Sequence, residues 1–401
     1  MESMKYIVIV PDGMADHPVP ELGGKTPLQA AHTPHMDALA AQGEVGTAVT
    51  VPEGLPADSA VANLSVMGYD PARWYTGRSP LEAVSMGIEM GAADVAFRCN
   101  LVTLSEDGPY AGKTMVDYSA GEISTDEARP LIHAVQAALG DDLRTFYAGI
   151  SYRHCMIWAG GPVGLDLTKP HDILGRPVAE HLPDREKAPD IYDLMEKSMA
   201  ILADHPVNKK RKEAGKNPAN AIWLWGEGKK PALTPFTEMY GKKGAVISAV
   251  DLVKGIGRCA GMDVIEVEGA TGNLHTNYAG KAKAALTALE HGADLVYVHI
   301  EAPDECGHQA DREGKIYSIE KIDSEVIGWL REQMKGTDYR MLVMPDHPTP
   351  LKLRTHTDEA VPFVICDSAG AKQGPARFSE TAEASLRLTE GYRLMARFLG
   401  R

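Results

Sequence analysis

The chain has 401 residues, of which 44% are hydrophobic and 24% charged, and Asp and Glu outnumber Lys and Arg by 55 to 41. The net charge of −14 argues against nucleic-acid binding and against docking on an anionic membrane, since both need clustered Lys and Arg. The apolar runs, such as residues 6–10 and 295–300, are strand-sized and too short to span a membrane. With five scattered cysteines, no Cys-x-x-Cys pair and no evident export signal, we expect a cytoplasmic protein with reduced thiols.

Both ends of the chain alternate predicted strands and helices. The expected elements are, in chain order, a strand at 6–10, a helix pattern over 28–40 that is interrupted near Pro34, a strand at 45–51, a helix at 61–67, a helix at 282–289, a strand at 295–300, a helix at 316–334, and strands at 341–344 and 361–365. Such alternation predicts an α/β fold with a mostly parallel sheet between helices. In these sheets the chemistry lies beyond the carboxyl ends of the strands.

The middle of the chain has a different pattern. Residues 105–188 combine one helix candidate with short strand candidates and end in a stretch rich in Gly and Pro. We interpret this segment as a smaller inserted α/β domain. The core domain would then comprise residues 1–104 and 189–401.

Side chains suited to metal binding follow several of the predicted strands. Asp304 and His308 are four residues apart, so they share one face of a helix or turn and can bind one cation. The other candidates, all near predicted strand ends, are Asp12, Asp346, His347 and His356. Mixed oxygen and imidazole ligands suit Mn²⁺ or Zn²⁺ better than Ca²⁺. Together these three Asp and three His residues predict a dinuclear metal site, although any one alone fits a helix cap or surface position.

Ser59 is the candidate nucleophile, and a simple helix N-cap is its alternative role. A serine hydroxyl is weakly nucleophilic unless a base or a metal activates it. No Gly-x-Ser-x-Gly elbow surrounds Ser59, which argues against an α/β-hydrolase triad. Activation by the predicted metals is the remaining route.

These motifs together resemble the alkaline phosphatase superfamily, and more narrowly the cofactor-independent phosphoglycerate mutases of the archaeal type, which also occur in bacteria. The resemblance includes Asp12 in Val-Pro-Asp-Gly, Ser59 in Asp-Ser-Ala-Val-Ala-Asn-Leu, and the predicted metal ligands. Further matching stretches are residues 68–71, 75–78, 97–100, 217–220, 269–272 and 276–278. The fold implied is an alkaline-phosphatase-like, mostly parallel sheet, with the inserted domain covering the substrate.

The resemblance also implies a ligand set and a reaction. One metal would be held by Asp304, His308 and His356, and the other by Asp12, Asp346, His347 and the oxygen of Ser59. The serine would take the phosphoryl group from phosphoglycerate and return it to the other hydroxyl, interconverting 3- and 2-phosphoglycerate in glycolysis and gluconeogenesis without 2,3-bisphosphoglycerate. Manganese is the favoured metal, with zinc, cobalt and magnesium as alternatives.

The sequence departs from the bacterial-type mutases next to the nucleophile. Those enzymes carry Asn-Ser-Glu-Val-Gly-His, whereas this chain has Asn63 where the histidine would stand. The acid that protonates the leaving group is therefore unassigned. The sequence does not predict an oligomeric state.

Cations that could bind the phosphate and carboxylate of a small phosphorylated acid are Arg78, Arg98, Arg153, His154, Lys254 and Lys281, with Arg153 and His154 favoured. Two other reactions remain open for the same site. One is a homoserine kinase-like phosphotransfer in threonine synthesis, because residues 151–155 and 170–173 resemble the members of this subfamily that have been proposed to phosphorylate homoserine. The other is metal-dependent phosphatase activity.

Overall fold

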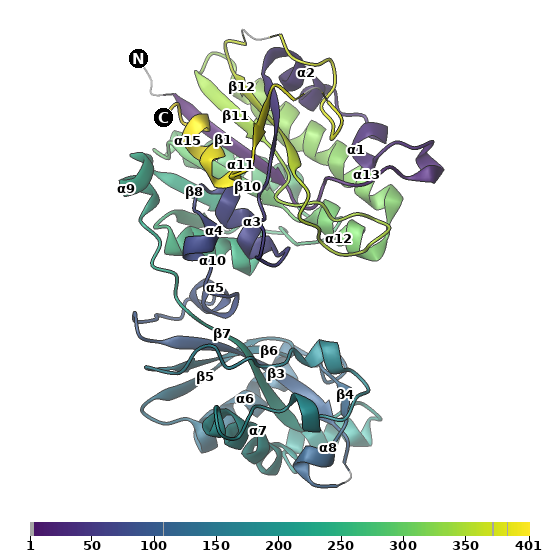
Figure 1. The fold of residues 1–401 in the computed structure, drawn as a ribbon, viewed down its shortest axis with the longest axis vertical. Coiled ribbons are helices and arrows are strands. Elements are labelled where there is room, and N and C mark those ends of the chain that lie inside the picture. Colours follow the sequence, from purple (N-terminus) through teal and green to yellow (C-terminus); the bar gives the residue numbers. More distant parts are fainter. Residues whose placement is uncertain (1–3, 107, 371–372, 383) are drawn as a thin grey trace. The chain divides into compact units, whose positions relative to one another are not determined.

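The computed structural model describes residues 4–106, 108–370, 373–382 and 384–401. The chain forms two compact units, Met1–Tyr75 with Ala232–Arg401, and Thr76–Pro231 (Figure 1). No disulfide joins cysteines in the described part of the chain. Within the same residues, no helix combines the length and the apolar composition required to cross a bilayer.

The first unit is built on a sheet with eight strands among the described residues. Its strands are β1 (Lys5–Pro11), β2 (Glu44–Ala48), β8 (Gly244–Ile247), β9 (Asp263–Ile265), β10 (Leu295–Ile300), β11 (Tyr339–Val343), β12 (Val361–Asp367) and β13 (Leu386–Leu388). They lie in the order β13-β2-β12-β11-β1-β10-β8-β9. All neighbouring pairs from β11 to β9 are parallel, whereas β12 is antiparallel to both of its neighbours. The predicted mostly parallel α/β fold is confirmed.

Helices surround this sheet (Figure 1). They are α1 (Pro27–Ala30), α2 (Pro34–Gln42), α3 (Ser59–Val66), α4 (Pro71–Trp74), α9 (Phe236–Tyr240), α10 (Asp251–Cys259), α11 (Tyr278–Glu290), α12 (Ala302–Gln309), α13 (Arg312–Lys321), α14 (Trp329–Gln333) and α15 (Leu394–Phe398). The single helix expected at 316–334 is interrupted, because a π-helical segment, Ile322–Gly328, joins α13 to α14.

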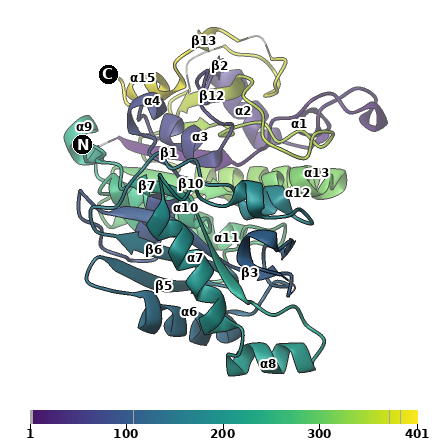
Figure 2. The ribbon, with the colours of Figure 1, turned by 60° about the horizontal axis from the view of Figure 1, so that its bottom comes forward.

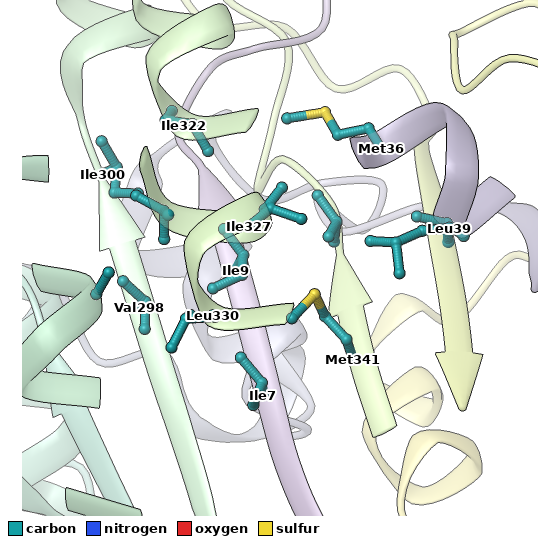
Figure 3. Close-up of a cluster of buried hydrophobic side chains, with 14 of the residues drawn as sticks. Ile7, Ile9, Met36, Leu39, Val298, Ile300, Ile322, Ile327, Leu330 and Met341 are labelled. Carbon is teal, nitrogen blue, oxygen red and sulfur yellow. The ribbon is translucent and has the colours of Figure 1, made fainter. Parts of the chain in front are cut away.

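The main core lies between one face of this sheet and its covering helices (Figure 3). Ile9 of β1 is level with Val298 of β10, and both are fully buried against side chains such as Ile327 of the π-helical segment. Burying each such side chain contributes about 1.5–3 kcal/mol. Because side chains alternate along a strand, Tyr297 and His299 of β10 point to the opposite face.

The second unit contains an antiparallel sheet. Its strands are β3 (Val95–Leu104), β4 (Met115–Asp117), β5 (Arg144–Ile150), β6 (Arg153–Trp158) and β7 (Ala221–Lys229). Its helices are α5 (Ser79–Ser85), α6 (Thr125–Leu139), α7 (Pro189–Leu202) and α8 (Pro206–Glu213). Helices α6 and α7 pack against each other and on strands β5 and β7 (Figure 2).

The limits of this unit differ from the expected 105–188. Strand β3 pairs with β6 on one side and with β7 on the other, so residues 95–104 and 221–229 belong to the inserted sheet. Both segments lie outside the range predicted for the inserted domain. The insertion therefore begins and ends outside these two strands, at Thr76 and Pro231.

Candidate functional site

Three adjacent parallel strands of the first unit bring the predicted metal ligands together. In the order β11-β1-β10, their carboxyl ends meet at one edge of the sheet. Asp12 follows β1, α12 follows β10, and the loop after β11 returns past the same edge. The predicted residues gathered there are Asp12, Ser59, Asp304, His308, Asp346, His347 and His356.

One group of ligands consists of Asp304, His308 and His356. Asp304 and His308 lie one turn apart on α12, and His308 Nε2 is 3.2 Å from Asp304 Oδ2. His356 Nε2 is 3.3 Å from Asp304 Oδ1. All three ligand atoms lie within 4.8 Å of one another, which is close enough for one cation to contact them together.

Backbone carbonyls orient the two imidazoles of this group. His308 Nδ1 lies 3.0 Å from the carbonyl oxygen of Arg354, and His356 Nδ1 lies 3.2 Å from that of Ala57. When each Nδ1–H donates to its carbonyl, both Nε2 lone pairs face the centre of the group. The two Nε2 atoms are only 3.0 Å apart, so a proton or a cation must lie between them. The donor set and its orientation fit a metal ion.

The hydrogen bonds and charges in this group favour an ionised Asp304 and a protonated His308. The hydrogen bond with Asp304 raises the pKa of His308 to about 9. Burial alone would raise the pKa of Asp304, but hydrogen bonds with His308 and His356 lower it well below the ordinary value. The carboxylate is therefore ionised and attracts positive charge, which a proton supplies here and a divalent cation would supply more strongly.

A second group surrounds Ser59, the first residue of α3. Its members are the fully or nearly fully buried side chains Asp12, Asp346 and His347. His347 Nε2 lies 3.1 Å from Ser59 Oγ and 3.5 Å from both Asp12 Oδ1 and Asp346 Oδ2. One imidazole nitrogen thus faces the hydroxyl and two carboxylates.

A positively charged group or a proton would stabilise Asp12 at this point. Burial raises its pKa well above the ordinary value, and the charges of Asp346 and Asp304 raise it further. Asp12 Oδ1 is buried and has no hydrogen-bond partner among the described residues. A buried acceptor of this kind is costly unless a positive group meets it. The second group also fits a metal ion.

Three buried residues near the carboxylates lie outside the set of ligands predicted from the sequence. His299 Nε2 is 3.1 Å from Asp12 Oδ2, and its Nδ1 is 3.3 Å from Ser248 Oγ. Burial lowers the pKa of His299 to about 4, so the ring is neutral at pH 7. Tyr297 donates to Asn63 Oδ1, and Asn63 Nδ2 in turn donates to Asp346 Oδ2. A His and a Tyr within an otherwise apolar strand were the available signal for two of them.

Two predicted substrate ligands also belong to the first unit. Lys281 on α11 is fully buried and donates to the carbonyl of His299 at 3.0 Å. Burial lowers its pKa to about 8. Lys254 on α10 instead faces two carboxylates, at 3.1 Å from Glu266 and 3.4 Å from Asp251. Both ammonium groups therefore have partners within their own unit.

In the second unit, three of the predicted arginines form a cluster. Arg98 is 2.9 Å from Glu82 and stacks 4.4 Å from the ring centre of Trp225. Arg78 lies 3.6 Å from the same glutamate. Burial lowers the pKa of Arg98, and the neighbouring charges of Arg78 and Arg153 lower it further, whereas Glu82 opposes them. Arg78 and Arg98 thus share the Glu82 carboxylate, and Arg153 lies near enough to Arg98 to affect its pKa.

His154 lies apart from this cluster. In the pairing of β3 with β6, Arg153 is opposite Asn100 and His154 is opposite Cys99, so the two residues favoured together face opposite sides of the sheet. Gly149 N donates to His154 Nδ1 at 3.0 Å, and burial lowers the pKa of His154 to about 3. The ring is neutral and buried, so it lacks the charge needed to attract an anion.

His171, for which the sequence suggested no role, lies beside the arginine cluster. Its ring centre is 5.5 Å from that of Trp225. Burial lowers its pKa, and the charges of Arg98 and Arg78 lower it further. An imidazole, three guanidinium groups and an aromatic face therefore gather on one side of this unit.

The chain is similar to proteins of one family along nearly its whole length. Residues 40–208 match the family model described as 2,3-bisphosphoglycerate-independent phosphoglycerate mutase. A relative from Geobacter sulfurreducens, named "Probable 2,3-bisphosphoglycerate-independent phosphoglycerate mutase", is 55% identical over 99% of this chain and 100% of its own.

Two solved structures have the same fold. A protein of Pyrococcus horikoshii has a TM-score of 0.84 and 28% identity, covering 100% of this chain and 98% of its own. The cofactor-independent phosphoglycerate mutase of Thermoplasma acidophilum has a TM-score of 0.68 and 29% identity, covering 99% of each chain.

Proposed function

Because the chain belongs to the family of 2,3-bisphosphoglycerate-independent phosphoglycerate mutases, we propose that it interconverts 3-phosphoglycerate and 2-phosphoglycerate by metal-dependent phosphoryl transfer through Ser59. One observation carries the proposal. Two groups of carboxylate and imidazole ligands converge at one sheet edge, and His347 Nε2 of the second group lies 3.1 Å from the hydroxyl of Ser59.

We assign one divalent cation to Asp304, His308 and His356, and a second to Asp12, Asp346, His347 and the oxygen of Ser59. The mixed oxygen and nitrogen donors favour Mn²⁺, with Zn²⁺, Co²⁺ and Mg²⁺ as alternatives. When bound, such ions lower the pKa of the serine hydroxyl and offset the negative charge of the phosphoryl group. The carboxylates and imidazoles hold that charge at a fixed place.

Ser59 is the proposed nucleophile. Its hydroxyl proton leaves as Oγ bonds to phosphorus, and the bond from phosphorus to the glycerate oxygen breaks. That oxygen keeps the electron pair and takes up a proton. The other glycerate hydroxyl then loses its proton and attacks the phosphorus of the phosphoserine, and Oγ leaves with the electron pair of the P–Oγ bond and takes up a proton, which restores the Ser59 hydroxyl. Asp58 caps α3 by accepting from Ala60 N at 2.7 Å, and this cap fixes the backbone that carries Ser59.

The arginine cluster of the inserted unit is the proposed site for the anionic groups of the substrate. Arg98 and Arg78 are held by Glu82, and Arg98 also stacks on Trp225, so the guanidinium groups are oriented before a ligand arrives. Oriented guanidinium groups bind carboxylates and phosphates through two parallel hydrogen bonds.

The test is a mutase assay without 2,3-bisphosphoglycerate. We expect activity with Mn²⁺, loss on chelation, recovery on adding the metal back, and loss in Ser59→Ala. Ser324→Ala is a matched control, because Ser324 is an exposed residue whose hydroxyl bonds only a helix carbonyl, and it should keep full activity. Activity that survives both chelation and Ser59→Ala would refute the mechanism.

Two further measurements separate the alternative reactions. NMR of a mixture with homoserine and ATP would reveal phosphohomoserine if the protein were a kinase-like phosphotransferase. Net release of inorganic phosphate from phosphoglycerate would indicate a phosphatase. We expect neither product at a rate comparable to isomerisation.

A further inference from the structure

A buried asparagine connects the helix of Ser59 to the carboxylate of Asp346. Asn63 lies one turn after Ser59 on α3 and is fully buried. Its Nδ2 donates to the carbonyl of Ser59 at 2.8 Å and to Asp346 Oδ2 at 2.7 Å. The hydroxyl of Tyr297, on β10, donates to Asn63 Oδ1 at 2.6 Å.

These bonds use both amide protons and an amide oxygen lone pair, so they determine the orientation of the amide. A 180° rotation of the amide would turn Oδ1 toward the Asp346 carboxylate and Nδ2 toward the Tyr297 hydroxyl. The first contact would then be repulsive. The two acceptors, the Ser59 carbonyl and the Asp346 carboxylate, therefore determine that Nδ2 faces them, and the hydroxyl of Tyr297 holds the amide in that position through its bond to Oδ1.

The same bond determines which lone pair of Asp346 remains available. Its Oδ1 accepts from the backbone N–H groups of Gly13 at 3.1 Å and His347 at 2.9 Å. Asn63 occupies one lone-pair direction of Oδ2. A carboxylate offers about four such directions. These bonds fill three of them, the side chain of Asp12 is a further hydrogen-bond partner of the carboxylate, and Oδ2 lies 3.5 Å from His347 Nε2, so Asp346 also faces the second ligand group.

Asn63 stands where bacterial-type mutases carry a histidine, yet an amide neither gains nor loses a proton near neutral pH. It therefore cannot protonate a leaving group. Its two donated bonds instead join the backbone carbonyl of Ser59 to the carboxylate of Asp346, which lies 283 residues after Asn63 in the sequence.

We propose that Tyr297 and Asn63 are a positioning pair that holds the Asp346 carboxylate at a fixed place relative to Ser59, so that the second ligand group is ordered before a cation binds. The proposal rests on the proposed function, because it assigns Asp346 to a metal ion. Hydrogen bonds that orient metal ligands typically change metal affinity by about 10–100-fold when they are removed.

The experiment is a Mn²⁺ titration by calorimetry on the full chain, comparing the wild type with Tyr297→Phe and Asn63→Ala. We expect two sites in the wild type. One site should weaken by about 10-fold in Tyr297→Phe and by about 100-fold in Asn63→Ala, and the other should stay within about twofold. At saturating Mn²⁺, kcat should fall while KM for phosphoglycerate stays within about twofold, since neither residue belongs to the arginine cluster.

Tyr240→Phe is the matched control. Tyr240 is also buried, and its hydroxyl donates at 2.8 Å to the carbonyl of Gly68, away from the carboxylates. It should leave both Mn²⁺ affinities unchanged. Far-UV circular dichroism of each metal-free variant establishes that it is folded, and Tyr297→Phe removes only one oxygen atom if Asn63→Ala fails to fold.

The outcomes separate this inference from the proposed function. Two wild-type sites with unchanged affinity in folded Tyr297→Phe would overturn the positioning pair and leave the metal assignment intact. An equal loss at both sites would also overturn it, because it would indicate general loosening of the fold. A wild type that binds no divalent cation would refute the metal assignment and this inference together.

Discussion

Gly13, which follows Asp12, is expected to be the least replaceable glycine of the candidate site. Its φ of +62° lies in the left-handed region, where a side chain is strained. A Cβ atom there would lie 2.5 Å from Thr349 Oγ1, 2.7 Å from Asp304 Oδ1 and 2.8 Å from Asp304 Cα. Gly13→Ala would therefore push against the side chain and backbone of Asp304, a proposed metal ligand.

Two costs add in this variant. The left-handed conformation costs a non-glycine residue about 1–2 kcal/mol. Forcing a methyl group into a packed site costs about 1–3 kcal/mol. We expect Gly13→Ala to lower the free energy of unfolding by about 2–5 kcal/mol. Since Asp304 must move, Mn²⁺ should also stabilise the variant less than it stabilises the wild type.

Gly23→Ala isolates the first cost. Gly23 has a φ of +68°, but no atom lies within 4 Å of its would-be Cβ. This control should lose only about 1–2 kcal/mol. Urea unfolding followed by circular dichroism, with EDTA and then with Mn²⁺, measures both variants. Equal destabilisation of the two would refute the steric argument, because the backbone term would then account for the whole effect.

Three other predictions concern a buried charge, a buried histidine and the arginine cluster. Lys315→Met should lower the free energy of unfolding in urea by about 3–5 kcal/mol, because it leaves the buried carboxylate that lies 2.8 Å from the ammonium group without its partner. The ion pair of Lys335 is exposed, so Lys335→Met should lower the free energy of unfolding by less than about 1 kcal/mol. Burial depresses the pKa of His154 from about 6.5 to about 3, so the contribution of the neutral ring to stability is complete above pH 6.5 and is lost as the pH falls toward 3. In acid unfolding curves, His154→Asn, which does not titrate, should lose stability less steeply with falling pH than the wild type. Identical curves for the two proteins would contradict this prediction. Arg98→Ala should raise KM for phosphoglycerate by about 10–100-fold in steady-state assays, since a charge-assisted hydrogen bond contributes about 1.5–3 kcal/mol. Arg185 is exposed, so the control variant Arg185→Ala should leave KM unchanged. Equal KM values in the two variants would exclude Arg98 from substrate binding.

Local patterns in the sequence predicted the part of the fold that holds the metal ligands. The apolar runs that became β1 and β10 are buried on both faces, as such runs predict. The spacing of Asp304 and His308 predicted their contact, because residues four apart on a helix are neighbours. Neither inference needs information from distant parts of the chain.

The limits of the inserted unit depend on pairing between distant segments. Residues 95–104 have the composition of a strand in either unit, and only their pairing with β6 and β7 places them in the second sheet. Arg153 and His154 are likewise predicted together as substrate ligands, because their local sequence does not show which sheet contains them or which face each occupies. Alternation along β6 separates them, and tertiary packing decides which of the two is buried.

By itself, the sequence determined the alternating elements, the polar residues at the strand ends and the serine that begins a helix, since periodicity and helix geometry act over a few residues. Only the tertiary structure decided which imidazole nitrogens face each other, and that Tyr297 reaches Asn63 across 234 residues. Such contacts follow from strand order, register and the carbonyls that each ring meets. Many pairings are compatible with the same local pattern, and packing of the whole core selects one of them.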